Sequence, residues 1–186
     1  MNKPAPKPVM ISDEVMELQK LFYQTHDYTR EQAKGRILVL GIGNYLMGDE
    51  GVGVHAVQAL SKVPLPEGVD IMDGGTGSFD LMPVMAQYPL VILIDATMDG
   101  RPPGTVEVLR PRFSADFPLV LSAHDVGLKD MIEALEFKGE LPEIILITVS
   151  IAGMKPMDIT LSDEVKKSLP EVVRRVKALV KESIIK

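Results

Sequence analysis

The sequence predicts an α/β fold: a three-layer, doubly wound and mostly parallel sheet of about five strands with helices on both faces. Short apolar runs alternate along the chain with segments of helical periodicity. The first run ends in a glycine turn, Gly41–Gly43, where a larger side chain would clash. Two acidic residues, Asp49 and Glu50, then precede the first helical pattern. In such folds, sites form at the carboxyl ends of the strands.

Composition narrows the class of protein. The chain has 186 residues, of which 46% are hydrophobic, so one domain with a substantial core is expected. Its net charge of -6 argues against nucleic acid or an anionic membrane as a main partner. It contains no cysteine, which excludes disulfides, thiolate metal sites and cysteine nucleophiles. With no signal-peptide core and no apolar run long enough for a bilayer, a soluble cytoplasmic protein is expected.

The N-terminal part precedes the first strand and is predicted to be an extension, residues 1–34, of a domain covering residues 35–186. Met1–Met10 is rich in proline, and Ser12 can cap a helix that runs to about Lys34. An apolar stripe on this helix is expected to pack on the domain's own flank, with docking of a partner as the alternative; the stripe comprises Val15, Leu18, Leu21 and Phe22.

The first α/β unit is predicted from Ile37–Leu40, a buried strand, and from a helix whose apolar positions run from Val52 to Leu60. Gly51 and Gly53 fall in the first turns of that helix, where each costs about 1 kcal/mol relative to alanine. Close backbone packing or access to a site is the usual reason. A purely structural interpretation is that Asp49 caps the helix and Glu50 favours its dipole.

Two further strands follow. Val69–Met72 is predicted to be a strand that ends in a tight, exposed glycine loop, Asp73–Gly77. Phe79–Gln87 is predicted to be a helix. Leu90–Ile94 is the most hydrophobic strand and ends in Asp95, which places a carboxylate where α/β folds carry their chemistry.

The remaining chain completes the sheet. Thr105–Leu109 alternates and is typical of an edge strand, and Ser122 can cap a helix that runs to about Phe137. Ile144–Ile151 is predicted to be the last strand. Ser162 starts the final helical region, which Pro170 is expected to divide into two helices.

Three candidate site residues follow three different strands: Glu50, Asp95 and His124. In a doubly wound sheet these junctions meet at one edge, where two carboxylates and an imidazole would form a divalent-metal site with open positions. The spacing alone indicates this only weakly, because no two of these residues share a local metal motif. A histidine at a helix start is more often structural than a ligand. His55, within the first helix, is interpreted as structural.

A dinucleotide site is the rival interpretation of the glycine turn. Gly41 and Gly43 match the start of a GxGxxG fingerprint, and Asp73 ends a strand as a ribose-binding acid would. Leu46, however, stands in place of the third glycine, and the acidic helix start would repel a pyrophosphate. Serine catalysis is also disfavoured, because the chain has no GxSxG elbow.

Four motifs in this order resemble the nickel-iron hydrogenase maturation endopeptidases: GIGNYLMGDEGVG (Gly41–Gly53), DGGT (Asp73–Thr76), LIDA (Leu93–Ala96) and SAHD (Ser122–Asp125). The resemblance extends from about Arg36 to the C-terminal helix. It implies an aspartyl-type endopeptidase that removes the C-terminal extension of a nickel-loaded hydrogenase large-subunit precursor.

The resemblance also implies roles for single residues. The family's metal-contacting residues fall on Glu50, Asp95 and His124, which are therefore the expected catalytic residues as well. The substrate cleft is expected to include Asn44, Asp49 and the DGGT loop, whose members are Asp73, Gly74, Gly75 and Thr76. Nickel is expected to arrive with the substrate and not to reside in the enzyme.

These expectations give a mechanistic hypothesis. Glu50, Asp95 and His124 contact the nickel in the precursor, and the site places the scissile peptide beside a polarised water or a general base. Asp95 is the first choice for that base and Asp49 a weaker one. Two other classes of function remain open, a non-cleaving chaperone of the metallated precursor and a nucleotide-binding enzyme.

Overall fold

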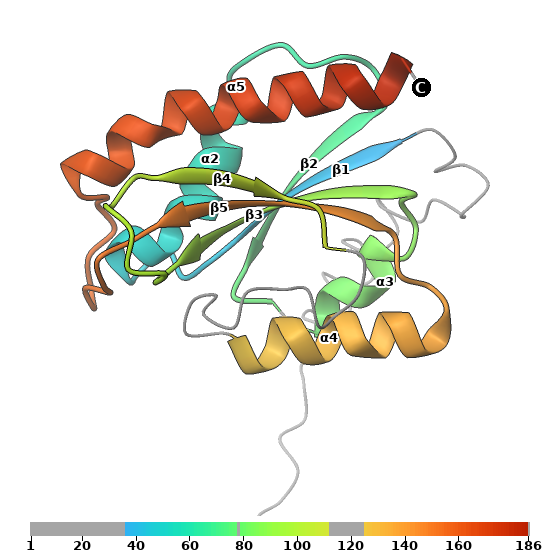
Figure 1. Cartoon of the computed structure of the whole chain (residues 1–186), viewed down its shortest axis with the longest axis horizontal. Helices are drawn as coiled ribbons and strands as arrows, with labels where there is room; N and C mark the ends of the chain where they lie inside the picture. The colour runs from blue at the N-terminus through green and yellow to red at the C-terminus, as the bar shows by residue number, and fades with distance from the viewer. Residues whose placement is uncertain (1–35, 78, 112–124, 186) are drawn as a thin grey trace, which may run out of the picture.

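The computed structural model describes residues 36–77, 79–111 and 125–185, which form a central sheet of five strands (Figure 1). The strand order is β2-β1-β3-β5-β4. Neighbouring strands run parallel except β4, which is antiparallel to β5 at the edge. The predicted doubly wound, mostly parallel sheet is confirmed, with β1 (Ile37–Ile42), β2 (Val69–Gly75), β3 (Leu90–Thr97), β4 (Val106–Leu109) and β5 (Glu143–Ser150).

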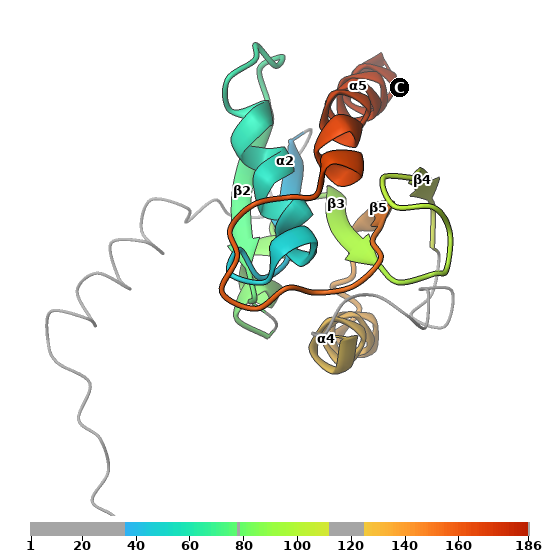
Figure 2. The ribbon, with the colours of Figure 1, turned by 90° about the vertical axis from the view of Figure 1, so that its left-hand side faces the viewer.

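Helices cover both faces of the sheet, which makes the predicted three layers (Figures 1 and 2). One face carries α2 (Val52–Leu60) and α5 (Asp163–Ile185). The other carries the short α3 (Met82–Met85) and α4 (Asp125–Lys138). Two 3₁₀ turns, η1 (Gly48–Gly51) and η2 (Phe79–Leu81), precede α2 and α3. Within the described ranges, no helix is long and apolar enough to cross a membrane.

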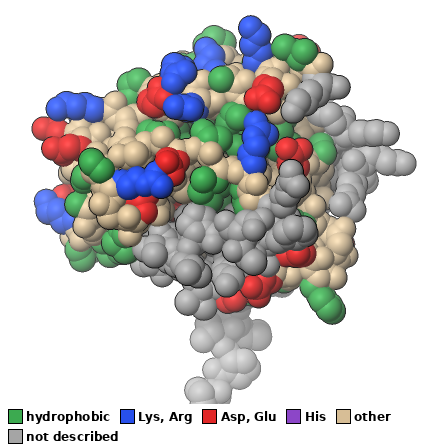
Figure 3. All heavy atoms as spheres, in the orientation of Figure 1, with side chains coloured by type: hydrophobic (Ala, Val, Ile, Leu, Met, Phe, Trp, Pro, Cys, Tyr) green, Lys and Arg blue, Asp and Glu red, His purple; other side chains and the backbone are tan. Residues whose placement is uncertain are grey.

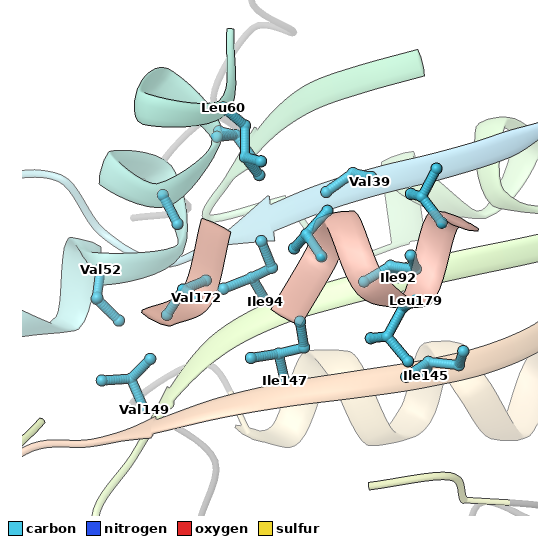
Figure 4. Packing of buried hydrophobic residues seen from close by; sticks show 14 of the residues in the cluster. Val39, Val52, Leu60, Ile92, Ile94, Ile145, Ile147, Val149, Val172 and Leu179 are labelled. Atoms are coloured by element: carbon cyan, nitrogen blue, oxygen red, sulfur yellow. The ribbon is translucent and has the colours of Figure 1, made fainter. Parts of the chain in front are cut away.

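The central strands are buried on both faces, which explains why they lack polar alternation. Every residue of β1 and of β3 is buried. Figure 4 shows the core beneath α2 and α5, where Val39 and Ile92 of the sheet lie near Leu60 and Leu179 of the helices. The predicted buried strands are confirmed, and so is the edge position of β4, which pairs with β5 in antiparallel orientation.

Glycine lets α2 lie directly on the sheet. A Cβ atom on Gly53 would collide with the carbonyl oxygens of Ile42 and Ile94, and one on Gly41 with the carbonyl of Gly53. The backbone of the first turn of α2 is therefore in contact with both β1 and β3. Close packing, one of the two reasons predicted for Gly53, is confirmed.

Two strands are longer than predicted. β3 continues through Asp95 to Thr97, because these residues pair with Thr148–Ser150 of β5 after the pairing with β1 has ended at Ile94. β2 continues through Asp73 to Gly75, with a register shift where Gly75 pairs with Ile42. Asp95 and Asp73 thus lie within strands and not in the loops that follow them.

The helix predictions were wrong in two places. Phe79–Gln87 is not one helix, because η2 precedes an α3 of only four residues. Pro170 does not divide the last helix, because α5 is continuous over Asp163–Ile185. An internal proline costs about 3 kcal/mol, but the helix buries Val165, Val172, Val176 and Val180 against the sheet. That burial holds both sides of Pro170 in one helix.

Candidate active site

Glu50 is buried at the carboxyl end of β1. It lies in η1, which packs against β3, and its side chain is 0% exposed. Its Oε2 accepts a hydrogen bond from the backbone N–H of Asn44. Gly43, with φ +139°, lets the chain pass close to the Glu50 carbonyl, where a Cβ atom would collide. The glycine turn therefore folds around Glu50. This explains how the Glu50 carboxylate can be buried so soon after β1 ends.

Asp95 is a second buried carboxylate at the same edge of the sheet. It is 2% exposed, and its Oδ1 accepts a hydrogen bond of 2.8 Å from the Ala96 N–H. Side chains alternate along a strand, so Asp95 points to the same face as Val91 and Leu93, the face covered by α3 and α4. A buried carboxylate is costly unless polar groups surround it. The position is therefore suited to a chemical role.

His124, the third predicted member of the site, lies outside the described residues. The helix that follows it, α4, begins at Asp125. Figure 1 shows that α4 starts beneath the carboxyl ends of the strands, on the face to which Asp95 points. Within the described ranges, no group of three histidine or acidic residues could hold a metal ion. The predicted site of Glu50, Asp95 and His124 stays a prediction.

Asp49 has a structural contact that the sequence did not indicate. Its Oδ1 accepts a hydrogen bond of 2.6 Å from the Ser162 N–H, and its Oδ2 accepts one of 2.8 Å from the Ser162 hydroxyl. Ser162 directly precedes α5, so Asp49 fixes the start of the last helix. The interpretation of Asp49 as the cap of α2 is wrong, because α2 has no side-chain cap. Its two oxygens are engaged, which argues against Asp49 as a general base.

Replacing Asp49 by alanine is therefore expected to lower the free energy of unfolding by about 2 kcal/mol, the range for hydrogen bonds to a charged group. Urea unfolding followed by circular dichroism measures this. Asp163→Ala is the matched control, because it removes an exposed acid from the same helix start and should cost less than about 1 kcal/mol. Equal losses in the two variants would contradict the anchoring role.

The DGGT loop and Asn44 lie beside the glycine turn. Gly43 N–H donates to the Gly75 carbonyl at 2.8 Å, which joins the end of β2 to the end of β1. The exposed Asp73 accepts a hydrogen bond from the Gly75 N–H at 2.9 Å, and Gly75 has φ +49°.

Asn44 closes a similar turn after β1, because its side-chain oxygen accepts a hydrogen bond from the Leu46 N–H at 3.0 Å. Gly74 is partly buried and Thr76 is exposed in the DGGT loop. The predicted role of these residues in a substrate cleft stays a prediction.

His55 packs as a structural residue, as interpreted from the sequence. Its ring stacks on Tyr45 with centroids 4.8 Å apart, and Nε2 lies 3.1 Å from the Ile159 carbonyl. Burial lowers the pKa of His55, opposed by the hydrogen bond to Ile159. His55 therefore joins α2 to the loop after β5.

Polar residues on β5 were missed by the sequence analysis. Thr148 pairs with Asp95 across the sheet and Ser150 pairs with Thr97, and all four are buried. Ser150 also donates to Asp99 Oδ2 at 3.1 Å. The sequence pattern could have indicated these residues, because Thr148 and Ser150 are two positions apart in an apolar strand and so share one face. They extend the polar surface around Asp95.

The two buried carboxylates are suited to oxygen ligation of a divalent cation or to proton transfer. A nucleotide phosphate would meet like charge here, since the buried Glu50 occupies the turn before α2. The site as described thus favours metal-assisted or acid–base chemistry.

Comparison with known proteins identifies the family. The family model described as "Hydrogenase maturation protease" matches residues 54–179. The hydrogenase 2 maturation protease of Escherichia coli K12 is 38% identical over 152 residues, covering 80% of this chain and 92% of that protein. The solved structure of the hydrogenase maturating endopeptidase HybD from E. coli superposes with a TM-score of 0.73 at 38% identity, covering 80% of this chain and 93% of that one. For the [NiFe] hydrogenase maturation protease HybD from Thermococcus kodakarensis, the TM-score is 0.64 at 28% identity, with 78% and 99% covered. The chain belongs to the hydrogenase maturation protease family, a family of endopeptidases.

Proposed function

We propose that this peptidase removes the C-terminal extension of a nickel-iron hydrogenase large-subunit precursor after nickel has been inserted. Membership of the family supports the reaction class. The observation that carries the assignment of the site is the burial of two carboxylates, Glu50 and Asp95, at the carboxyl edge of the sheet.

The nickel ion is part of the substrate in this proposal. Glu50, Asp95 and His124 would offer two carboxylates and an imidazole to an ion that the precursor carries into the cleft. Contact with the ion would fix the precursor's C-terminal segment and so place the scissile peptide bond near Asp95. The nickel requirement then restricts cleavage to precursor that has already been metallated.

Asp95 is proposed as the general base. Hydrolysis requires a water to lose a proton as it attacks the scissile carbonyl, and a positioned carboxylate can accept that proton and return it to the leaving nitrogen as the C–N bond breaks. Asp49 is the weaker candidate, because both of its oxygens bind Ser162. Asp95 is therefore the catalytic carboxylate, and Asp49 is a structural one.

Apolar side chains exposed around this edge support a protein substrate. They lie on the segments that follow β1, β2, β3 and β5, and the most exposed is Met157 at 88%. Aromatic side chains and methionine are enriched in protein interfaces, and three of these exposed residues are of those types. Besides Met157, the exposed apolar residues at this edge are Leu46, Phe79, Met98 and Ile159. We define these five residues as the apolar rim.

Met157 gives a test of the apolar rim. It has φ 59°, a left-handed conformation that is strained for methionine and well tolerated by asparagine. Met157→Asn is therefore expected to keep the fold stable but to raise KM for the precursor about tenfold, the effect of one interface residue worth about 1.4 kcal/mol. Steady-state cleavage kinetics measure this.

Phe137→Asn is the matched control for Met157→Asn. Phe137 is 94% exposed at the end of α4, shortly before β5 begins, and so lies at the opposite edge of the sheet. This variant should leave KM unchanged. The same change in KM in both variants would show that the apolar rim does not contribute to substrate recognition.

The function is tested by incubating the chain with a nickel-loaded precursor and measuring the intact mass of the precursor. The expected result is loss of a C-terminal peptide with the wild-type chain and an unchanged mass with His124→Ala. Stable association without any mass change would instead indicate a non-cleaving chaperone and overturn the proposal.

A further inference from the structure

An apolar groove lies far from the candidate site, at the amino-terminal edge of the parallel strands. Its walls are Pro64–Pro66, in the connection between α2 and β2, and the last turns of α5, and its volume is about 460 Å³. Ile184 and Ile185 line it and are 49% and 75% exposed. Figure 3 shows hydrophobic side chains at the surface over the C-terminal end of α5. Two neighbouring exposed isoleucines favour an occupant.

The chain enters the sheet beside this groove. The Ile37 N–H donates to the Gly68 carbonyl at 2.8 Å, and Gly68 is two residues after Pro66. The start of β1 also lies near the second wall of the groove, because Ser183 of α5 lines a hollow together with Arg36 and Ile37. The described part of the chain therefore begins, at Arg36, close to both walls of the groove.

The N-terminal sequence carries a segment that matches the groove in length and charge. Its predicted apolar stripe, from Val15 to Phe22, is about 10 Å long as a helix, and the groove follows α5 for about 12 Å, at 1.5 Å per residue. Lys177 and Lys181 line the groove. Residues 12–22 contribute three acids, Asp13, Glu14 and Glu17, against one basic residue, Lys20, so the segment carries a net charge of −2.

The connection is long enough for the segment to reach the groove. Residues 23–35 span about 20 Å as a helix and about 40 Å when extended. A tether of this length also gives the segment an effective concentration of the order of millimolar at the groove. A free partner would need to compete with that concentration.

We propose that residues 12–22 of this chain dock as a helix in the groove formed by Pro64–Pro66 and the C-terminal turns of α5. The apolar stripe then covers Ile184 and Ile185, and the acidic residues face Lys177 and Lys181. The extension is thereby held at the edge of the sheet opposite the candidate site, which leaves the precursor's route to that site clear. The docking does not depend on the proposed peptidase reaction.

Cysteine cross-linking tests the docking directly, because the chain has no cysteine of its own. The test variant combines Phe22→Cys with Ile184→Cys in the full chain. The matched control combines Phe22→Cys with Met157→Cys, since Met157 is exposed on the loop after β5, at the other edge. Each variant is oxidised at low protein concentration, checked by circular dichroism for a native spectrum, and analysed on non-reducing gels and by peptide mass spectrometry.

The expected result is an intramolecular disulfide that forms about tenfold faster in the test variant than in the control. Equal rates, or no disulfide in the test variant, would overturn the proposal. Disulfides that join two chains would also overturn it and would show that a second copy occupies the groove.

Hydrogen exchange provides a second measurement that needs no cysteine. Most of the stability of a helix in a protein comes from packing of its apolar face, so the amides of residues 12–22 should be strongly protected only if the segment is docked. Protection in the wild-type chain should fall at least tenfold in Ile184→Glu and remain in the control Phe137→Glu. Exchange at the rate of an unstructured peptide in the wild-type chain would overturn the proposal.

Discussion

Replacing Asp95 by asparagine is expected to lower the rate of precursor cleavage at least 100-fold, the usual contribution of a general base. Asparagine has the same shape, and its Oδ1 can still accept the hydrogen bond that Asp95 receives from the Ala96 N–H. The change therefore removes the carboxylate and preserves the backbone contact. Single-turnover cleavage of nickel-loaded precursor measures the effect, because it reports chemistry and not product release.

The control for this variant is Asp130→Asn, which removes an exposed carboxylate from α4. It should cleave at the wild-type rate. Thermal unfolding of Asp95→Asn should show a folded protein, so that a lost rate is a chemical effect. Full activity of both Asp95→Asn and His124→Ala would contradict the proposed mechanism.

Replacing Gly53 by alanine is expected to lower the free energy of unfolding strongly. A Cβ atom at this position meets the carbonyl oxygens of Ile42 and Ile94, which belong to two buried strands and cannot move aside cheaply. Overpacking of a core costs about 1–3 kcal/mol and sometimes more; a backbone collision on two sides should reach at least about 3 kcal/mol. Urea unfolding of the purified protein gives the value.

Gly153→Ala is the matched control, because its Cβ atom would meet no atom within 4 Å. Its free energy of unfolding should stay within about 0.5 kcal/mol of the wild type. A Gly53→Ala protein as stable as this control would show that α2 can move off the sheet. In the expected case, the collision at Gly53 also displaces η1 and Glu50, so cleavage activity should fall together with the free energy of unfolding.

The sequence predicted the elements that depend on local pattern. The apolar runs predicted the buried strands, the alternation of β4 predicted an edge, and the glycines of the first motif predicted close packing of α2. These features need only side-chain period and backbone sterics. The positions of Glu50 and Asp95 at one edge of the sheet followed from the same logic, since parallel strands share their carboxyl edge.

The features that escaped prediction depend on contacts between distant parts of the chain. Asp95 lies inside β3 because β5 continues to pair with it after β1 has ended. Asp49 resembles a local helix cap in the sequence, but its partner is Ser162, which packs beside it only in the folded chain. Pro170 lies inside a continuous helix although a proline usually ends or kinks one, because the burial of α5 against the sheet outweighs the cost of the proline. Such effects require the register and the packing to be known.

In the proposed mechanism, two buried acids and a histidine act on a nickel ion that arrives with the substrate. Intact-mass analysis of nickel-loaded and nickel-free precursor, each incubated with chelator-treated, metal-free enzyme, tests this mechanism. We expect only the nickel-loaded precursor to lose its C-terminal peptide. Cleavage of both precursors at the same rate would contradict it.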